Sequence, residues 1–165
     1  MTKLVISPNV ILKTICQEWD FEKDKGSKDL EVSMVEAMIN NKGRGLAANQ
    51  IGIDKRVFAI HLDNQVPFCM FNPKILSASE ELVEVEEGCL SFPNLFLKVK
   101  RHKSISAEYF DRNNNKCIIE LTGMDARCFQ HELDHLNGVC FTDNISPLKL
   151  ALAIKKQRKR NGRTK

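Results

Sequence analysis

Two histidines four residues apart, His131 and His135, constrain this chain more than any other feature of its sequence. Glu132 follows the first of them, so the segment has the pattern His-Glu-x-x-His. On an α-helix, residues i and i+4 lie on one face, so both imidazoles can reach one divalent cation while the carboxylate lies close enough to handle a proton. The pattern therefore predicts a helix with a metal site of the hydrolytic kind on one face.

A metal bound by two histidines needs a third protein ligand, and the sequence lacks the two usual ones. No glutamate follows Glu132, so the downstream glutamate of thermolysin-like proteases is absent. The metzincin pattern continues to Gly138 but has Phe141 where its third histidine belongs. The third ligand therefore comes from upstream, or from an acid such as Asp143.

A cysteine thiolate is the favoured third ligand, because sulfur and imidazole together suit ions such as Zn²⁺ and Fe²⁺. Cys128 lies seven residues before His135, which is about 10 Å along a helix axis and too far for one shared ion. We expect Cys128 at the floor of the pocket instead. Cys89 follows a strand-like run and Gly88, which permits close approach of the backbone to a ligand. Cys89 is therefore the preferred candidate.

Three motifs, in this order, make the chain similar to the peptide deformylase family. They are Gly43-Arg44-Gly45-Leu46-Ala47-Ala48-Asn49-Gln50, Glu87-Gly88-Cys89-Leu90-Ser91 and Gln130-His131-Glu132-Leu133-Asp134-His135. The likeness extends over nearly the whole chain, from the region of Pro8 to Lys149. One His-Glu-x-x-His motif also occurs by chance in ordinary helices, whereas the ordered triplet is highly specific.

The resemblance implies a function and a role for each motif residue. Cys89, His131 and His135 would hold one divalent ion with water in the fourth position, and Glu132 would accept the proton of that water. The implied reaction removes the formyl group from N-formyl-methionyl peptides and releases formate. The Gln50 amide and the Leu90 backbone N–H would stabilise the charge that develops on oxygen. Fe²⁺ is the expected native ion, and Zn²⁺, Ni²⁺ or Co²⁺ can replace it.

The resemblance also implies a substrate pocket, lined by Arg44, Gly45, Glu87, Gly88, Met124, Arg127 and Cys128. Arg44 and Arg127 stand where the family generally has aliphatic residues. Their stems can still pack on apolar surface while their charged ends point outward, so methionine remains the expected first side chain of the substrate. Glu87 is interpreted as structural, with Arg101 as its candidate partner, rather than as catalytic.

The motifs also admit other interpretations. Gly43, Gly45 and Ala48 fit a loose dinucleotide-binding fingerprint, but that motif follows a strand and opens a helix, whereas this segment follows a helical run and leads to a strand. An extended segment that pairs with substrate backbone fits better. A metalloendopeptidase and a non-enzymatic ribosome- or RNA-binding module remain as alternative functions. The missing downstream ligand disfavours the first, and the second would need no metal.

The composition favours one enzyme domain. The 165 residues, 42% of them hydrophobic, suffice for one core. No apolar run is long enough to cross a membrane, and the first residues lack a signal-peptide core. The six cysteines have no CxxC pairing, which argues against a disulfide framework or a zinc ribbon. We expect a monomer without membrane contact, in the cytoplasm of a bacterium or of the host if a phage encodes it.

Charge separates the C-terminal end from the rest of the chain. Residues 155–165 hold seven lysines and arginines and no acid, and since the whole chain carries +4, the other 154 residues sum to −3. We therefore distinguish a deformylase-like catalytic domain, residues 1–154, from a basic C-terminal tail, residues 155–165. Such a tail is either a solvated chain end or a docking segment for ribosomal RNA.

The expected fold class is α+β, with mostly antiparallel sheets around a central metal-binding helix and a further helix at the C-terminus. Ser7-Pro8 is expected to start a short helix that reaches Trp19, and a second helix covers about 29–41. Strands are expected near 56–62, 67–72, 81–87, 104–110 and 116–121, with a hairpin turn from Asp111 to Asn115. The metal helix is expected to have Thr122 as N-cap, with Asp125 three residues on, and to close at Asn137-Gly138. The last helix begins at Ser146-Pro147.

Overall fold

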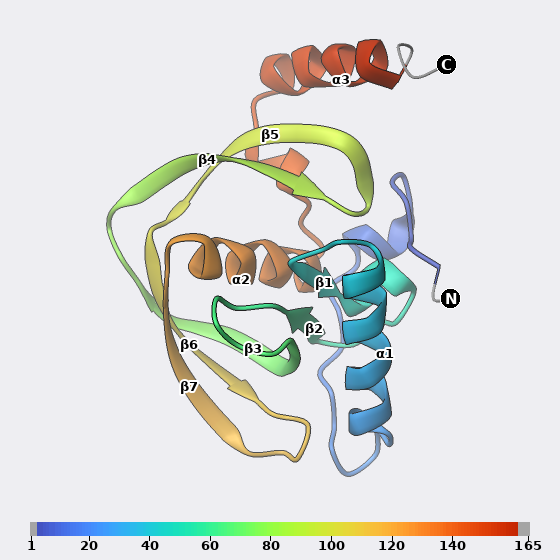
Figure 1. The fold of residues 1–165 in the computed structure, drawn as a ribbon, viewed down its shortest axis with the longest axis vertical. Coiled ribbons are helices and arrows are strands. Elements are labelled where there is room, and N and C mark those ends of the chain that lie inside the picture. Colours follow the sequence, from blue (N-terminus) through green and yellow to red (C-terminus); the bar gives the residue numbers. More distant parts are fainter. Residues whose placement is uncertain (1–2, 162–165) are drawn as a thin grey trace.

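Two antiparallel sheets organise the structure, a computed structural model that describes residues 3–161 (Figure 1). The larger sheet has the strand order β1-β2-β3-β6-β7, and the smaller one consists of β4 and β5. The larger sheet is formed by Gly45–Ala47 (β1), Val57–Ile60 (β2), Phe68–Ala78 (β3), Ser104–Phe110 (β6) and Lys116–Thr122 (β7). The hairpin of the smaller sheet is formed by Leu82–Cys89 (β4) and Phe92–His102 (β5). Every neighbouring pair is antiparallel, which confirms the predicted mixture of helices with antiparallel sheets.

Helices pack against both sheets. The α-helices are Ser27–Asn40 (α1), Gly123–Leu136 (α2) and Pro147–Asn161 (α3). Short 3₁₀ helices cover Val10–Lys13, Ala48–Ile51 and Phe141–Asn144. In Figure 1, α2 lies between the β4–β5 hairpin and the larger sheet, and it contacts strands of both. The segment with the His-Glu-x-x-His pattern lies within α2.

The start of α2 differs from the prediction in one detail. Thr122 occupies the N-cap position, but its side chain makes no capping hydrogen bond. Asp125 does not turn back to the N-cap either, because its carboxylate accepts a hydrogen bond from the backbone N–H of Asp63 and pairs with Arg44. The first turn of α2 is therefore tied to the loop after β2 rather than capped by its own side chains.

Strand β2 is buried on both of its faces, which explains its unbroken apolar sequence. Phe58 points toward α2, where its ring meets that of Phe129 edge to face, with centroids 5.2 Å apart at 89°. Val57 and Ala59 point the other way, into a second core beneath α1. Because alternate residues of a strand face opposite sides, β2 joins the two cores and fixes α2 on the sheet.

The predicted helix from Ser7-Pro8 to Trp19 is wrong. Only the four residues Val10–Lys13 are helical, in a 3₁₀ turn capped by the side chain of Asn9. After it the chain is extended, and the backbone N–H of Cys16 donates to the carbonyl of Leu136 at the end of α2. The spacing of apolar residues indicated a local helix here. The backbone instead pairs with the end of α2.

The predicted boundary between catalytic domain and tail, after residue 154, lies inside helix α3. The side chains Leu150, Ala153 and Ile154 of this helix pack against an apolar cluster, here called the β5 cluster, whose buried members are Leu95, Leu97, Val99 and Phe141. Arg163 and Lys165 of the predicted tail lie outside the described residues. Across residues 3–161, no helix is both long and apolar enough to span a membrane.

Candidate metal centre

Three side chains converge where the hairpin meets α2. The Sγ of Cys89 lies 3.2 Å from Nε2 of His135. One ligand atom from each of Cys89, His131 and His135 lies within 4.8 Å of the others. One sulfur and two nitrogens at this spacing fit the tetrahedral coordination of an ion that keeps a fourth position open. Asp143, the other candidate, instead pairs with Lys13 and accepts from the backbone N–H of Cys140.

Local structure explains how the three residues meet. His131 and His135 are one turn apart on α2, so their rings share a face, with centroids 5.1 Å apart. Cys89 is the last residue of β4 and follows a register shift after Gly88. A β-bulge of this kind re-aims the following side chain, here toward α2. A Cβ on Gly88 would lie 2.9 Å from the Phe96 ring, so a larger residue here would displace that ring.

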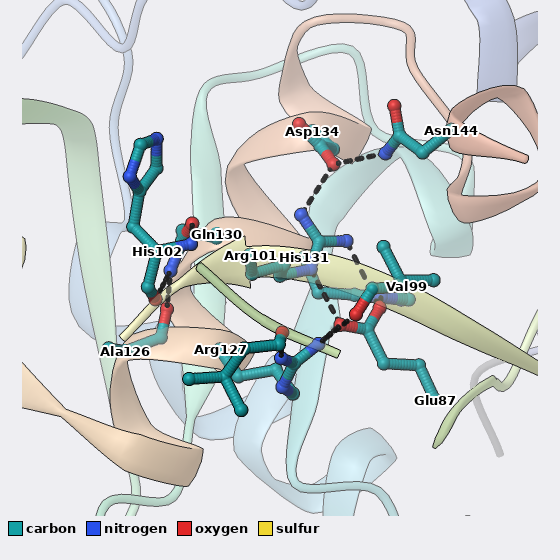
Figure 2. A network of polar contacts seen from close by, with 11 residues as sticks. Glu87, Val99, Arg101, His102, Ala126, Arg127, Gln130, His131, Asp134 and Asn144 are labelled. Atoms are coloured by element: carbon teal, nitrogen blue, oxygen red, sulfur yellow. Dashed lines mark hydrogen bonds and ion pairs between the residues drawn. The ribbon is translucent and has the colours of Figure 1, made fainter. Parts of the chain in front are cut away.

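Glu87 orients the first histidine. Its Oε2 accepts a hydrogen bond from Nδ1 of His131 at 3.0 Å, which leaves Nε2 of that ring for an ion (Figure 2). Arg101 donates to both carboxylate oxygens, at 2.6 and 3.0 Å, as the structural interpretation of Glu87 predicts. Burial alone would raise the pKa of Glu87, but the hydrogen bonds from His131 and Arg101 and their charges lower it to about 2. Carboxylate–histidine pairs of this kind fix the tautomer of a metal ligand.

The electrostatics of the two histidines suit a cation. Burial would lower the pKa of His131, but its hydrogen bonds with Cys89 and Glu87 outweigh burial and raise the pKa to about 10. The hydrogen-bond acceptors on Cys89 and Glu87 therefore favour a positive charge at His131. Burial, followed by the charges of His131 and Arg101, lowers the pKa of His135 well below its usual value, so His135 is in the neutral form that binds metals.

Glu132 lies beside the three candidate ligand residues and is almost completely buried. Its Oε2 has no hydrogen-bond partner within residues 3–161. Burial is the main cause that raises the pKa of this carboxyl to about 7. A buried carboxyl with one unpaired oxygen and this pKa is suited to accepting and returning a proton near neutral pH.

Gln50 is held in one orientation beside the cysteine. Its Oε1 accepts a hydrogen bond from the backbone N–H of Ala47 at 2.8 Å, so the NH₂ group points the other way. That group lies 3.5 Å from Sγ of Cys89 and donates to Oγ of Ser91 at 3.1 Å. The amide therefore presents donors to the space next to the candidate metal ligands.

A cavity of about 480 Å³ opens onto these residues. Its lining includes all the residues predicted for the substrate pocket, namely Arg44, Gly45, Glu87, Gly88, Met124, Arg127 and Cys128, and also Leu90. Residues 92–96 of β5 line it as well, although the sequence did not indicate a strand there. The alternation of Leu95, Leu97 and Val99, all buried, was the available signal for β5.

Arg44 and Arg127, which stand where the family generally has aliphatic residues, both have guanidinium groups paired with carboxylates. Arg44 pairs with Asp125 and, at 2.9 Å, with Asp63. Arg127 pairs with Glu87 at 2.6 Å. The cavity therefore meets arginine stems whose guanidinium groups are already neutralised by carboxylates.

The fold and this group of side chains define a metal-dependent hydrolase: sulfur and two imidazoles converge beside a buried carboxylate in a cavity. The family model described as polypeptide deformylase matches residues 1–151. The chain belongs to the polypeptide deformylase family.

Relatives and solved structures agree with this assignment. A peptide deformylase of Wolbachia sp. subsp. Brugia malayi is 39% identical, with 94% of this chain and 93% of that protein covered. The crystal structure of a peptide deformylase from Legionella pneumophila has a TM-score of 0.89 at 33% identity and covers 99% of this chain and 97% of that one. The peptide deformylase from Ehrlichia chaffeensis, solved in complex with actinonin, has a TM-score of 0.85 at 38% identity, with 95% of each chain covered.

Proposed function

We propose that this chain removes the N-formyl group from the initiator methionine of nascent polypeptides and releases formate. The observation that carries the proposal is the convergence of Cys89, His131 and His135 beside the buried carboxylate of Glu132, in a chain of the deformylase family. In this reaction a water oxygen attacks the formyl carbon, the C–N bond breaks, and the amine nitrogen takes up a proton.

Cys89, His131 and His135 would hold one divalent ion. Bound there, the ion would act as a Lewis acid and lower the pKa of a water molecule. One thiolate and two imidazoles accept Fe²⁺, Zn²⁺, Ni²⁺ or Co²⁺. We propose Fe²⁺ as the native ion.

The chain's own groups handle the proton and the charge. Glu132 accepts the proton of the attacking water and delivers it to the departing amine, for which its pKa of about 7 is well suited. The NH₂ group of Gln50 and the backbone N–H of Leu90 stabilise the negative charge that develops on the formyl oxygen. The bond between Gln50 Oε1 and the Ala47 N–H supports this role, because it keeps the amide donors pointed into the site.

Substrate binding uses β1 and the cavity. β1 is the edge strand of the larger sheet, and Gly45 of β1 lines the cavity. An extended peptide can therefore add to this edge through main-chain hydrogen bonds. The first side chain of the substrate enters the cavity, where the neutralised arginine stems and Met124 accept methionine.

Formate release by the metal-loaded protein tests the proposed function. We expect a formyl-methionyl tripeptide to yield formate and free amine in equal amounts. Glu132→Gln should lower kcat by about 10²–10⁴-fold, since it removes the proton acceptor but keeps the shape. Cleavage of internal bonds in unformylated peptides without formate would instead favour a metalloendopeptidase. If Glu132→Ala left the biological activity untouched, the non-enzymatic alternative would be favoured.

We also propose that the basic tail docks to ribosomal RNA. Lys155, Lys156, Arg158 and Lys159 are exposed on the last turns of α3, and cationic side chains bind RNA by releasing its counterions. The cytoplasmic location and the monomeric state stay predictions from the sequence.

A further inference from the structure

Glu87 receives a second guanidinium that the proposed reaction does not use. Arg127, on α2, donates from Nη1 to Oε1 of Glu87 at 2.6 Å, and Arg101 donates to the same oxygen from the other side of the carboxylate group (Figure 2). The other oxygen of Glu87 accepts from Arg101 and from Nδ1 of His131. Four donor atoms thus fix both oxygens of one carboxylate in a buried position.

Arg127 also ties α2 to both strands of the hairpin. Its Nη1 donates to the carbonyl of Val99 in β5 at 2.9 Å, and its Nη2 donates to the carbonyl of Val83 in β4 at 2.5 Å. The residue is only 5% exposed. Charge-assisted bonds of this kind are stronger than neutral ones, and they persist best where water is excluded.

These contacts lie between the two sources of the metal ligands. The imidazoles of His131 and His135 come from α2, whereas the thiol of Cys89 comes from β4, two residues after Glu87. Any shift of the hairpin relative to α2 changes the distance between sulfur and nitrogen. Any rotation of the Glu87 carboxylate changes the direction in which His131 presents its Nε2.

We propose that Arg127 is a positioning residue for the metal centre: it holds the Glu87 carboxylate and the β4–β5 hairpin in register with α2, so that His131 and Cys89 meet one ion. The inference rests on the proposed function for the identity of the ligands. Arg127 lines the cavity, as the sequence predicted, and the proposal adds a role that acts through Glu87. Removing a residue that supports a metal ligand through hydrogen bonds typically lowers the metal affinity about 10–100-fold.

Zn²⁺ affinity, measured on the full chain by competition with a chromophoric chelator, tests the proposal. Arg127→Met keeps much of the side-chain length but removes every donor, and we expect its Zn²⁺ dissociation constant to rise about 10–100-fold. Arg127→Lys keeps the charge but not the fork of donors, so an intermediate value is expected. Arg112→Met is the matched control, because Arg112 forms an ion pair with Glu31 on the surface, remote from the hairpin. Its Zn²⁺ affinity should equal that of the wild type.

A double-mutant cycle with Glu87→Gln identifies the route of the effect. If Arg127 acts through Glu87, Arg127→Met should weaken Zn²⁺ binding much less in the Glu87→Gln background than in the wild type. Additive losses would overturn the proposal. If Arg127→Met does not fold, the same comparison is made with Arg127→Lys.

The other outcomes are distinct. Unchanged Zn²⁺ affinity with a raised KM for formyl-methionyl peptides would make Arg127 a substrate contact and contradict the proposal. Unchanged affinity with only a lower melting temperature would make it a structural residue, and would also contradict it. Because Zn²⁺ binding is read without substrate, a wild-type protein that failed to release formate would refute the proposed function and leave this test intact.

Discussion

Glu132 and Gly45 show how closely the backbone of β1 approaches α2. A Cβ built on Gly45 would lie 2.3 Å from Oε1 of Glu132 and 2.7 Å from its Cγ and Cδ. Real carbon–oxygen contacts do not reach this distance, so glycine is needed here for space rather than for an unusual backbone conformation. The first motif and the metal helix therefore depend on each other at this contact, in addition to the pair of Arg44 with Asp125.

Gly45→Ala should displace the Glu132 carboxylate and reduce formate release. A misplacement of about 1 Å in a reacting group can lower the rate about 10²-fold, and we expect a loss of that order in kcat for the metal-loaded variant. The measurement is steady-state kinetics with a formyl-methionyl peptide, alongside a thermal unfolding curve. Ser77→Ala, on an exposed part of β3, serves as the control and should be fully active. Unchanged kcat in Gly45→Ala would contradict the contact.

The residue types at the metal centre could be predicted from the sequence, but their arrangement could not. The spacing of His131 and His135 predicts a shared helix face, and the motif order identifies Cys89 as a candidate ligand. The ion pair of Arg127 with Glu87 joins α2 to β4. These residues are 40 positions apart in the chain, so no local sequence pattern indicates the contact. The sequence therefore indicated that Arg127 lines the cavity, but it did not indicate the ion pair that the same side chain makes with Glu87.

At the scale of elements, strands were predictable where alternation and turn signals agreed. The strands near 104–110 and 116–121, and the turn between them, agree with β6 and β7 within one residue. β1 has only three residues and gives too short a signal. In β5, Pro93 and Asn94 suggest a loop, and Asn94 has a φ of 61°, so these residues conceal the inward alternation that follows them. Phe92 and Phe96, on either side of these residues, pair with Cys89 and Gly88 of β4, so the strand continues past the irregularity.

The turn between β6 and β7 is built on one carboxylate. Oδ1 of Asp111 accepts hydrogen bonds from the backbone N–H groups of Asn113 and Asn115, each at 2.8 Å, and Oδ2 accepts from the Asn115 side chain at 2.9 Å. Burial alone would raise the pKa of Asp111, but the hydrogen bonds from Asn115 and Asn113 outweigh it and lower the pKa below its usual value. The turn therefore stabilises the charged form of this carboxyl.

Asp111→Ala should lower the melting temperature by about 2–4 °C at pH 7, since the turn loses its acceptor. A carboxyl whose pKa is lower in the folded state stabilises the fold above its unfolded pKa of about 3.9, and that contribution disappears as pH falls through the folded pKa. The difference between wild type and variant should therefore shrink at low pH. Asp111→Asn keeps an acceptor without titrating, so its difference from Asp111→Ala should not depend on pH. An equal gap between wild type and Asp111→Ala at pH 7 and pH 3 would exclude the role of charge.

At the scale of the whole molecule, α3 is both part of the fold and the carrier of the basic charge. Its apolar side chains, including Leu150 and Ile154, pack against the β5 cluster. Lys149 near its start is exposed as well, and a dense run of exposed cations begins at Lys155, one residue after that contact ends. A truncation that begins at residue 155 therefore removes the charge and leaves the packing side chains in place.

Deleting residues 155–165 should weaken ribosome binding in a salt-dependent way and leave the hydrolysis of short formyl peptides unchanged. Each lost phosphate contact reduces the dependence of log affinity on log salt, by about 0.7–0.9 per contact. Co-sedimentation with ribosomes over a range of salt concentrations, together with peptide kinetics, measures both effects. Equal ribosome affinity with and without the tail would remove this proposal.

The central claim is that Cys89, His131 and His135 bind one divalent ion that catalysis requires. X-ray absorption at the metal edge of the active protein tests it most directly. We predict one sulfur at about 2.3 Å and two nitrogens at about 2.0–2.1 Å for a zinc-loaded sample, loss of the sulfur in Cys89→Ala, and loss of formate release when the ion is removed. A metal without a sulfur neighbour, or metal-free protein that still releases formate, would contradict the account.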